Sequence, residues 1–140
     1  MMNSAIKLCL MCSGIFLLFG MIAGVVKYKQ IMKSPVNKAS AYINIAHSAS
    51  FLYSFAALVM AELLKFSPYS LTAQKWMAGI PLFCFALTIG QYLRLGLENK
   101  TDNQFKEQNL TNTFGMELII AGEIGGVSLI IWGFFKTQIF

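Results

Sequence analysis

The sequence predicts an all-α protein whose four helices form a transmembrane bundle, and both its composition and its charge distribution lead to this prediction. Of the 140 residues, 56% are hydrophobic and only 12% are charged. Soluble domains are about 45–50% apolar and about 25% charged, so this chain lacks the charges that a water-soluble surface needs. The charges are also absent from long stretches, since nineteen uncharged residues separate Lys7 from Lys27. Each such stretch reaches the roughly 20 residues with which a helix crosses about 30 Å of hydrocarbon.

The first two expected spans are residues 6–26 and 41–64. The first has an apolar core longer than that of a cleaved signal peptide, and no small-residue cleavage site follows it, so we expect it to be retained. Ser34 and Pro35 separate the two spans, because the residue before a proline tends to leave the helical conformation. Across most of the second span the only ionisable side chains are His47 and two tyrosines.

The last two expected spans are residues 76–97 and 114–135. A polar stretch, residues 98–113, lies between them and is expected to be a solvated loop. Backbone groups in lipid have to be hydrogen-bonded within the protein, and the apolar residues do not alternate as in a barrel strand, so all four spans are expected to be helices. We treat residues 1–140 as one integral membrane domain.

The basic residues are unevenly distributed between the two ends of the expected bundle. Seven of the 11 lysines and arginines lie in or beside the first and third connections. The positive-inside rule therefore predicts that both chain termini lie outside the cytoplasm. Basic residues at helix ends anchor to lipid headgroups, and no basic stripe interleaved with aromatic residues accompanies the net charge of +5, so nucleic acid is excluded as a partner. We expect a multi-pass protein of the bacterial inner membrane.

The cysteines and the glycines of the spans indicate helix packing more than a metal-binding or redox site. Cys9 and Cys12 form a C-x-x-C inside an apolar span without a second such pair, and Cys84 lies alone in the third span, so neither zinc nor redox chemistry is indicated. Small residues let helix backbones approach closely in lipid. The fourth span contains such a group, made of Gly122, Gly125, Gly126, Ser128 and Gly133.

His47, the only histidine in the chain, is the first candidate site residue. Ser50 and Ser54 follow it at i+3 and i+7, so a helix places all three on one polar face. Imidazole is a good iron ligand and a good proton shuttle, and a single histidine can be one axial ligand of a haem. A lone histidine inside a membrane also serves as a hydrogen-bonding group between helices, and the residues alone leave both roles open.

Tyr92, Glu117 and Glu123 are the other polar groups that need a partner or a role inside the spans. Tyr92 lies near the end of the third span, where tyrosine often belongs to the aromatic belt at the headgroups. Glu117 is close enough to the start of the fourth span to reach water. Glu123 is deeper, and its expected partners are a hydroxyl group or Gln91, unless the carboxyl is itself protonated.

Short motifs in all four spans resemble those of the membrane-embedded styrene oxide isomerases and, more loosely, the hydroxylaminobenzene mutases. The first span is similar to the glycine-bearing first helix of that family. Ala46-His47-Ser48 is similar to the Ala-His-Ser of the isomerases, and Gly90-Gln91-Tyr92 occurs where they have Gly-Phe-Tyr. His47 and Tyr92 in the second and third spans are the most specific part of the resemblance.

The resemblance implies a homotrimer that holds haem b between neighbouring subunits, with His47 as the axial ligand of the iron. In that family the iron acts as a Lewis acid on the oxygen of a small hydrophobic epoxide, and a 1,2-hydride shift then produces the aldehyde. Tyr92 matches the tyrosine that stabilises the opened intermediate. Tyr53 stands where the isomerases have asparagine, six residues after the histidine, so it is the second catalytic candidate. Ser50 and Ser54 are expected to contact the cofactor.

Other functions stay open. Small four-helix exporters need a carboxylate deep in the first span for proton coupling, and Glu123 is the only substitute here. A membrane glutathione enzyme would need arginine together with glutamate inside the spans, and Arg94 lies at an edge. The last alternative is an accessory subunit without catalysis, whose helices pack against a larger complex.

Overall fold

The computed structural model describes residues 3–106 and 110–139 and consists of long helices joined by short connections. No strand occurs in these ranges, so the all-α prediction is confirmed for them. The four helices are each long and apolar enough to cross a membrane. Their bounds are α1 (Ser4–Lys33), α2 (Ala41–Leu64), α3 (Leu71–Glu98) and α4 (Leu110–Gln138).

Three of the helices start at a residue whose side chain caps free backbone amides. Asn3 accepts a hydrogen bond from the Ile6 amide at the start of α1, and Ser40 and Ser70 act in the same way for α2 and α3. The helix α2 has the expected bounds, whereas α1, α3 and α4 extend beyond the expected spans, and α4 begins inside the stretch that was expected to be a loop. Hydropathy locates only the part of a helix that lies in hydrocarbon. A helix of 30 residues such as α1 is about 45 Å long, which exceeds the roughly 30 Å thickness of a hydrocarbon core.

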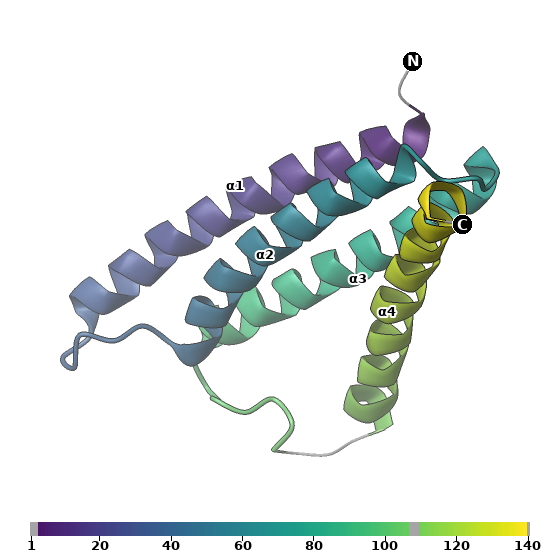
Figure 1. Cartoon of the computed structure of the whole chain (residues 1–140). Coiled ribbons are helices and arrows are strands. Elements are labelled where there is room, and N and C mark those ends of the chain that lie inside the picture. Colours follow the sequence, from purple (N-terminus) through teal and green to yellow (C-terminus); the bar gives the residue numbers. More distant parts are fainter. Residues whose placement is uncertain (1–2, 107–109, 140) are drawn as a thin grey trace.

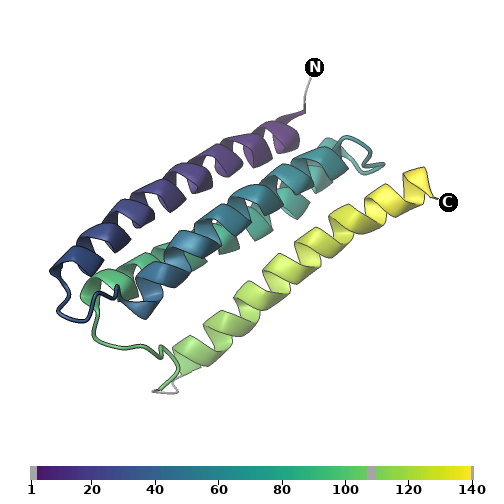
Figure 2. The same ribbon diagram turned by 60° about the vertical axis from the view of Figure 1, so that its left-hand side comes forward.

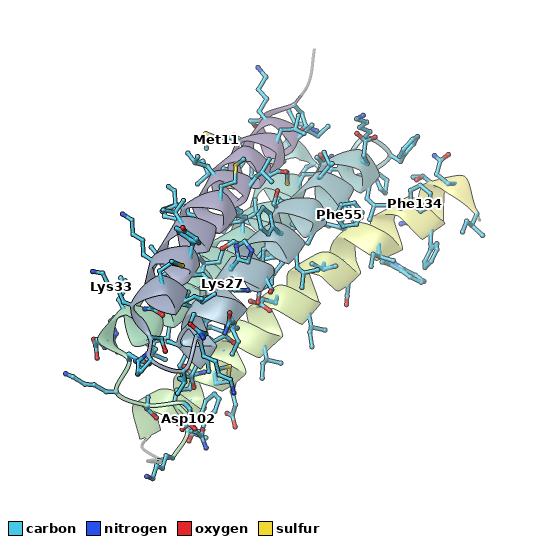
Figure 3. All side chains as sticks on the ribbon, turned by 90° about the vertical axis from the view of Figure 1, so that its left-hand side faces the viewer. Met11, Lys27, Lys33, Phe55, Asp102 and Phe134 are labelled. Carbon is cyan, nitrogen blue, oxygen red and sulfur yellow. The ribbon has the colours of Figure 1, made fainter. Side chains whose placement is uncertain are left out.

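The helices alternate in direction, so the α1–α2 and α3–α4 connections lie at one end and the chain termini at the other (Figures 1 and 2). Lys33 and Asp102 lie toward the first end, and Phe134 lies toward the opposite end (Figure 3). We call these the lysine-rich end and the terminal end. The most extensive helix contact is between α1 and α2, and α4 contacts α3 and α2.

The main hydrophobic core lies toward the terminal end of the bundle. It contains Phe16 of α1, Met60 of α2, Phe85 of α3 and Ile130 of α4, all buried. Large apolar side chains such as Leu18 also cover the outside of the bundle. An apolar exterior around an apolar core is the distribution expected for helices surrounded by lipid.

Toward the lysine-rich end, polar contacts connect the helices instead. The Gln30 side chain of α1 donates a hydrogen bond to the Gly96 carbonyl of α3 (3.0 Å) and accepts one from the Ser40 amide (2.9 Å). Because a Cβ at Gly96 would lie 2.7 Å from the Ile43 backbone nitrogen, this position needs glycine for α2 and α3 to approach. Gln30 and Gly96 therefore hold α1, α2 and α3 together where the main core is absent.

Glycines of α4 produce its close contact with α3 and with the connection that precedes α3. A Cβ at Gly126 would lie against the Pro81 ring and 2.8 Å from the Met77 carbonyl, and one at Gly122 would lie 2.9 Å from Cys84 Sγ. Gly125 has no neighbouring atom within 4 Å of such a Cβ. The small residues of the fourth span therefore pack as expected at Gly122 and Gly126, whereas Gly125 makes no close helix contact.

We predict that Gly126→Ala lowers stability and that Gly125→Ala does not. The added methyl at residue 126 forces α3 and α4 apart and is expected to cost about 1–3 kcal/mol. At residue 125 the methyl enters open space, and alanine favours the helix over glycine by about 1 kcal/mol. Thermal unfolding of the two purified variants in one detergent measures the difference. Equal melting temperatures would contradict the described α3–α4 contact.

Candidate functional site

His47 of α2 packs against α1 and forms one defined hydrogen bond. Its Nδ1 lies 2.8 Å from the carbonyl oxygen of Gly20. A carbonyl can only accept a hydrogen bond, so Nδ1 carries the proton, and in the neutral ring Nε2 presents a lone pair. Nε2 forms no hydrogen bond with another described residue. The helix contact thus selects the tautomer in which Nε2 is available as a ligand or as a proton acceptor.

Two glycines of α1 make room for this arrangement. A Cβ at Gly24 would lie 3.0 Å from His47 Cε1, and a Cβ at Gly20 would lie 3.0 Å from Cε1 of Phe51. The Phe51 ring meets the imidazole edge to face, with 5.0 Å between the ring centroids. The imidazole is therefore held between the α1 backbone and an aromatic side chain of its own helix. Such support on two sides fixes the direction of Nε2.

Ser50 and Ser54 use their hydroxyl groups within the bundle. The buried Ser50 hydroxyl donates to the Ala46 carbonyl one turn earlier in α2 (2.7 Å). The Ser54 hydroxyl donates to the Ser13 carbonyl of α1 (2.8 Å) and lies 3.3 Å from the Ser13 hydroxyl. Both serines therefore contribute to helix packing, and their contact with a cofactor stays a prediction.

Tyr53 and Tyr92, the two catalytic candidates, lie at the interface of α2 and α3. The Tyr53 ring stacks on Phe85 of α3, with 4.1 Å between centroids and 10° between planes. The Tyr92 ring stacks on Tyr42 of α2, with 5.9 Å between centroids. Neither tyrosine is fully buried. Their rings thus have aromatic partners that orient them, and these partners differ from that of His47.

Glu123 of α4 extends the polar group at this interface. It follows Gly122, which contacts α3, and the Thr88 side chain lies beside its carboxyl group and beside Tyr53. Oε1 is buried, and no described residue donates a hydrogen bond to it. Of the two expected partners of the carboxyl, the Thr88 side chain supplies the hydroxyl group beside it, whereas Gln91 lines an open cleft near the lysine-rich end. Glu117 is exposed, as its position predicted.

The candidate residues form two groups on different sides of α2. His47 contacts α1, whereas Tyr53 contacts α3 and Tyr92, which belongs to α3, stacks on Tyr42 of α2. In the described part of the chain, no three histidine, cysteine or acidic side chains cluster as metal ligands. A single histidine suits a metal whose remaining ligands come from a macrocycle, because a porphyrin supplies four nitrogens of its own.

Comparison of the chain with family models, curated proteins and solved structures finds no match. The resemblance to the isomerase–mutase group consequently remains a prediction.

Sequence reasoning did not identify Gly20, Gly24 and Phe51 as part of the His47 environment. Gly20 and Gly24 have the small-xxx-small spacing with which helices approach in membranes, so their pattern could have indicated a contact surface on the first span. The sequence does not indicate which helix this surface meets. The pairing of His47 with that surface comes from the structure alone.

We predict that Glu123→Leu raises the stability of the bundle. The substitution removes a buried oxygen without a described partner and puts an apolar side chain of similar size in its place. This exchange is expected to stabilise the bundle by about 1–3 kcal/mol. Glu117→Leu on the exposed part of the same helix is the matched control, with an expected change within about 0.5 kcal/mol. Thermal unfolding in detergent measures both. A lower melting temperature for Glu123→Leu would indicate that the carboxyl has a partner in the assembled protein.

Proposed function

We propose that this chain is a multi-pass integral membrane protein that binds haem b through His47. We further propose that it assembles as a homotrimer of the isomerase–mutase type and isomerises a small hydrophobic epoxide in the bacterial inner membrane. The observation that carries the haem proposal is the hydrogen bond from His47 Nδ1 to the Gly20 carbonyl, which directs the lone pair of the neutral ring to Nε2.

Membrane insertion is supported by the length and the surface of the helices. The described helices include four of sufficient length and hydropathy, and their exposed positions carry large apolar residues such as Leu18, Phe55 and Phe83. Exposed apolar area of this extent is unfavourable in water and ordinary in lipid.

The environment of His47 agrees with what a metal-binding imidazole requires. A ligating histidine usually donates its other ring hydrogen to a backbone carbonyl or a carboxylate, which sets the tautomer and the ring orientation. Gly20 supplies this carbonyl, and Gly24 and Phe51 restrict the ring. When bound, haem iron supplies a Lewis acid that polarises an epoxide oxygen.

The tyrosines supply the polar groups of the proposed site. The Tyr92 hydroxyl donates a hydrogen bond to the substrate oxygen, and stacking on Tyr42 orients its ring. Tyr53 carries a phenol in place of the asparagine of the isomerases, and Phe85 holds that ring in place. His47 is held by α1, and Tyr92 is held by Tyr42 of α2. The assembly with sites between subunits is what the resemblance to the isomerases implies.

Glu123 favours one alternative, a small proton-coupled transporter. A partly buried carboxyl inside a membrane, one oxygen of which has no described hydrogen-bond partner, is a common feature of proton pathways. Proton-driven uptake of a substrate into vesicles, lost in Glu123→Gln and retained in Glu117→Gln, would favour transport. An accessory subunit without catalysis would show neither uptake nor isomerisation.

We predict that the purified protein, expressed with ample haem, is red and shows a Soret band that His47→Ala abolishes. Ser48→Ala is the matched control, because Ser48 is the exposed neighbour of His47 and has no described side-chain hydrogen bond. Absorbance spectra of the three proteins in detergent give the result. Colourless wild-type protein would exclude the haem proposal.

A second pair of variants separates the orientation of His47 from its presence. Gly24→Ala keeps the imidazole but places a methyl 3.0 Å from Cε1, whereas Gly14→Ala adds its methyl to open space. We expect Gly24→Ala to shift the Soret band or weaken haem retention, and Gly14→Ala to leave both unchanged. Identical spectra would contradict the role of the α1 contact in directing the ligand.

We predict that Tyr92→Phe retains haem and loses most of the conversion of styrene oxide to its aldehyde. Removal of one positioned donor to a developing charge typically costs about 10²–10³ in rate. Tyr28→Phe is the control, because Tyr28 is an exposed tyrosine of α1. Aldehyde formation is measured together with the Soret absorbance of each variant. Equal rates for wild type and Tyr92→Phe would remove Tyr92 from the mechanism.

A further inference from the structure

An open cleft lies between the second half of α3, the α3–α4 connection and the first half of α4. Its volume is about 740 Å³, and His47 is not among the residues that line it. The two helices diverge in Figure 1, where α4 lies near α3 at the terminal end and departs from it toward the α3–α4 connection. The close glycine contacts follow this pattern. Gly126 contacts α3, whereas a Cβ at Gly115 on the cleft wall would have no neighbour within 4 Å.

The connection that borders the cleft is held in a defined position. The Gln104 amide donates a hydrogen bond to the Tyr42 hydroxyl of α2 (2.6 Å). Within the connection, the Asn103 amide donates to the Thr101 hydroxyl (3.1 Å), and the Phe105 amide donates to the Asn103 side chain (2.9 Å). These bonds attach the edge of the cleft to the bundle.

The described rim of the cleft carries three cations. Arg94, Lys100 and Lys106 line it, and none of the described lining residues is a carboxylate. Arg94 has a long ion pair with Glu98, 3.8 Å between the charged atoms, and both side chains are exposed, so this pair contributes little. No other ion pair of these three residues occurs among the described residues. The rim can therefore bind an anion without breaking a strong internal contact.

The inner part of the cleft is mainly apolar. Leu87 of α3 lies opposite Met116 and Ile119 of α4, with the Gln91 amide between this part and the rim. From Leu87 to Arg94 of the rim the α3 axis rises about 10 Å, which lies within the roughly 15 Å that one leaflet contributes to the hydrocarbon core. An apolar inner part at this depth below a cationic rim matches an acyl chain below an anionic headgroup.

We propose that this cleft binds one anionic phospholipid, with an acyl chain against Leu87 and Ile119 and the phosphate at Arg94 and Lys100. Charge complementarity favours a phospholipid with net negative charge over a zwitterionic one. The cleft opens at the lysine-rich end, where the positive-inside rule places the cytoplasmic leaflet and its anionic lipids. The inference depends on membrane insertion and is independent of haem binding and of catalysis.

The test measures lipid retention by the full-length protein in a neutral detergent. Phosphatidylglycerol and phosphatidylcholine with identical acyl chains are added in turn, and native mass spectrometry and the melting temperature are recorded. We expect phosphatidylglycerol to bind about tenfold more tightly and to raise the melting temperature. Equal binding of the two lipids would overturn the proposal. Lipid binding by colourless protein would support this inference while excluding the haem proposal.

Two variants locate the binding site. Arg94→Gln with Lys100→Gln should abolish the preference, whereas Lys29→Gln with Lys33→Gln removes two charges at the same end outside the cleft and should preserve it. Gly115→Phe fills the apolar part and should reduce retention of phosphatidylglycerol while the protein remains helical by circular dichroism. Equal loss in both double variants, or full retention by Gly115→Phe, would overturn the assignment.

A soluble anion distinguishes a lipid site from a simple phosphate site. Glycerol phosphate presents the same charge without an acyl chain. We expect it neither to raise the melting temperature nor to displace phosphatidylglycerol. If glycerol phosphate protects the protein as well as the lipid does, the cleft binds anions alone and the acyl-chain assignment is wrong.

Discussion

Close approach of neighbouring helices at glycine positions sets the spacing of the helices in this bundle. Lipid is as apolar as the side chains, so helices in a membrane associate through packing and hydrogen bonds more than through hydrophobic burial. Gly20 and Gly24 admit the aromatic rings of α2, Gly96 admits the α2 backbone, and Gly126 admits Pro81. At each of these positions glycine has no side chain, and a neighbouring residue occupies the space. Together these contacts set the distances between α1, α2, α3 and α4.

The same contacts decide where chemistry is available. The glycines of α1 bring a backbone carbonyl to His47, which turns a lone histidine into an imidazole with a defined tautomer. The glycines of α4 bring Glu123 to the α3 surface beside Thr88, where the buried oxygen lacks a described donor. Beyond Gly122 the close α3–α4 contacts end, and the cleft with its cationic rim begins at Ile119 and Leu87. Packing and polar sites in this protein are therefore consequences of the same small residues.

The distribution of buried residues gives the two ends of the bundle different properties. The main core lies toward the terminal end, around residues such as Phe16 and Ile130, and holds the helices by side-chain packing. Toward the lysine-rich end the helices are connected by Gln30, Gly96 and the bond between Tyr42 and Gln104. Such polar connections are specific in geometry but fewer than the packing contacts of the main core, so α4 can diverge from α3 at this end. The bundle therefore combines a closely packed end with an end that contains an open cleft.

The sequence by itself determined the number and type of the helices, because length, hydropathy and charge placement reflect the thickness of the bilayer without reference to neighbours. It also singled out His47, Tyr92 and Glu123, since polar groups in apolar spans are conspicuous wherever they point. The sequence could not show which neighbouring helix each of these side chains contacts. The helices carry apolar residues on all sides, because exposed and core-facing positions are both apolar, so periodicity does not reveal which side meets which partner. Only the tertiary structure decided that His47 faces α1, that Tyr92 stacks on Tyr42, and that Gln91 faces the cleft instead of Glu123.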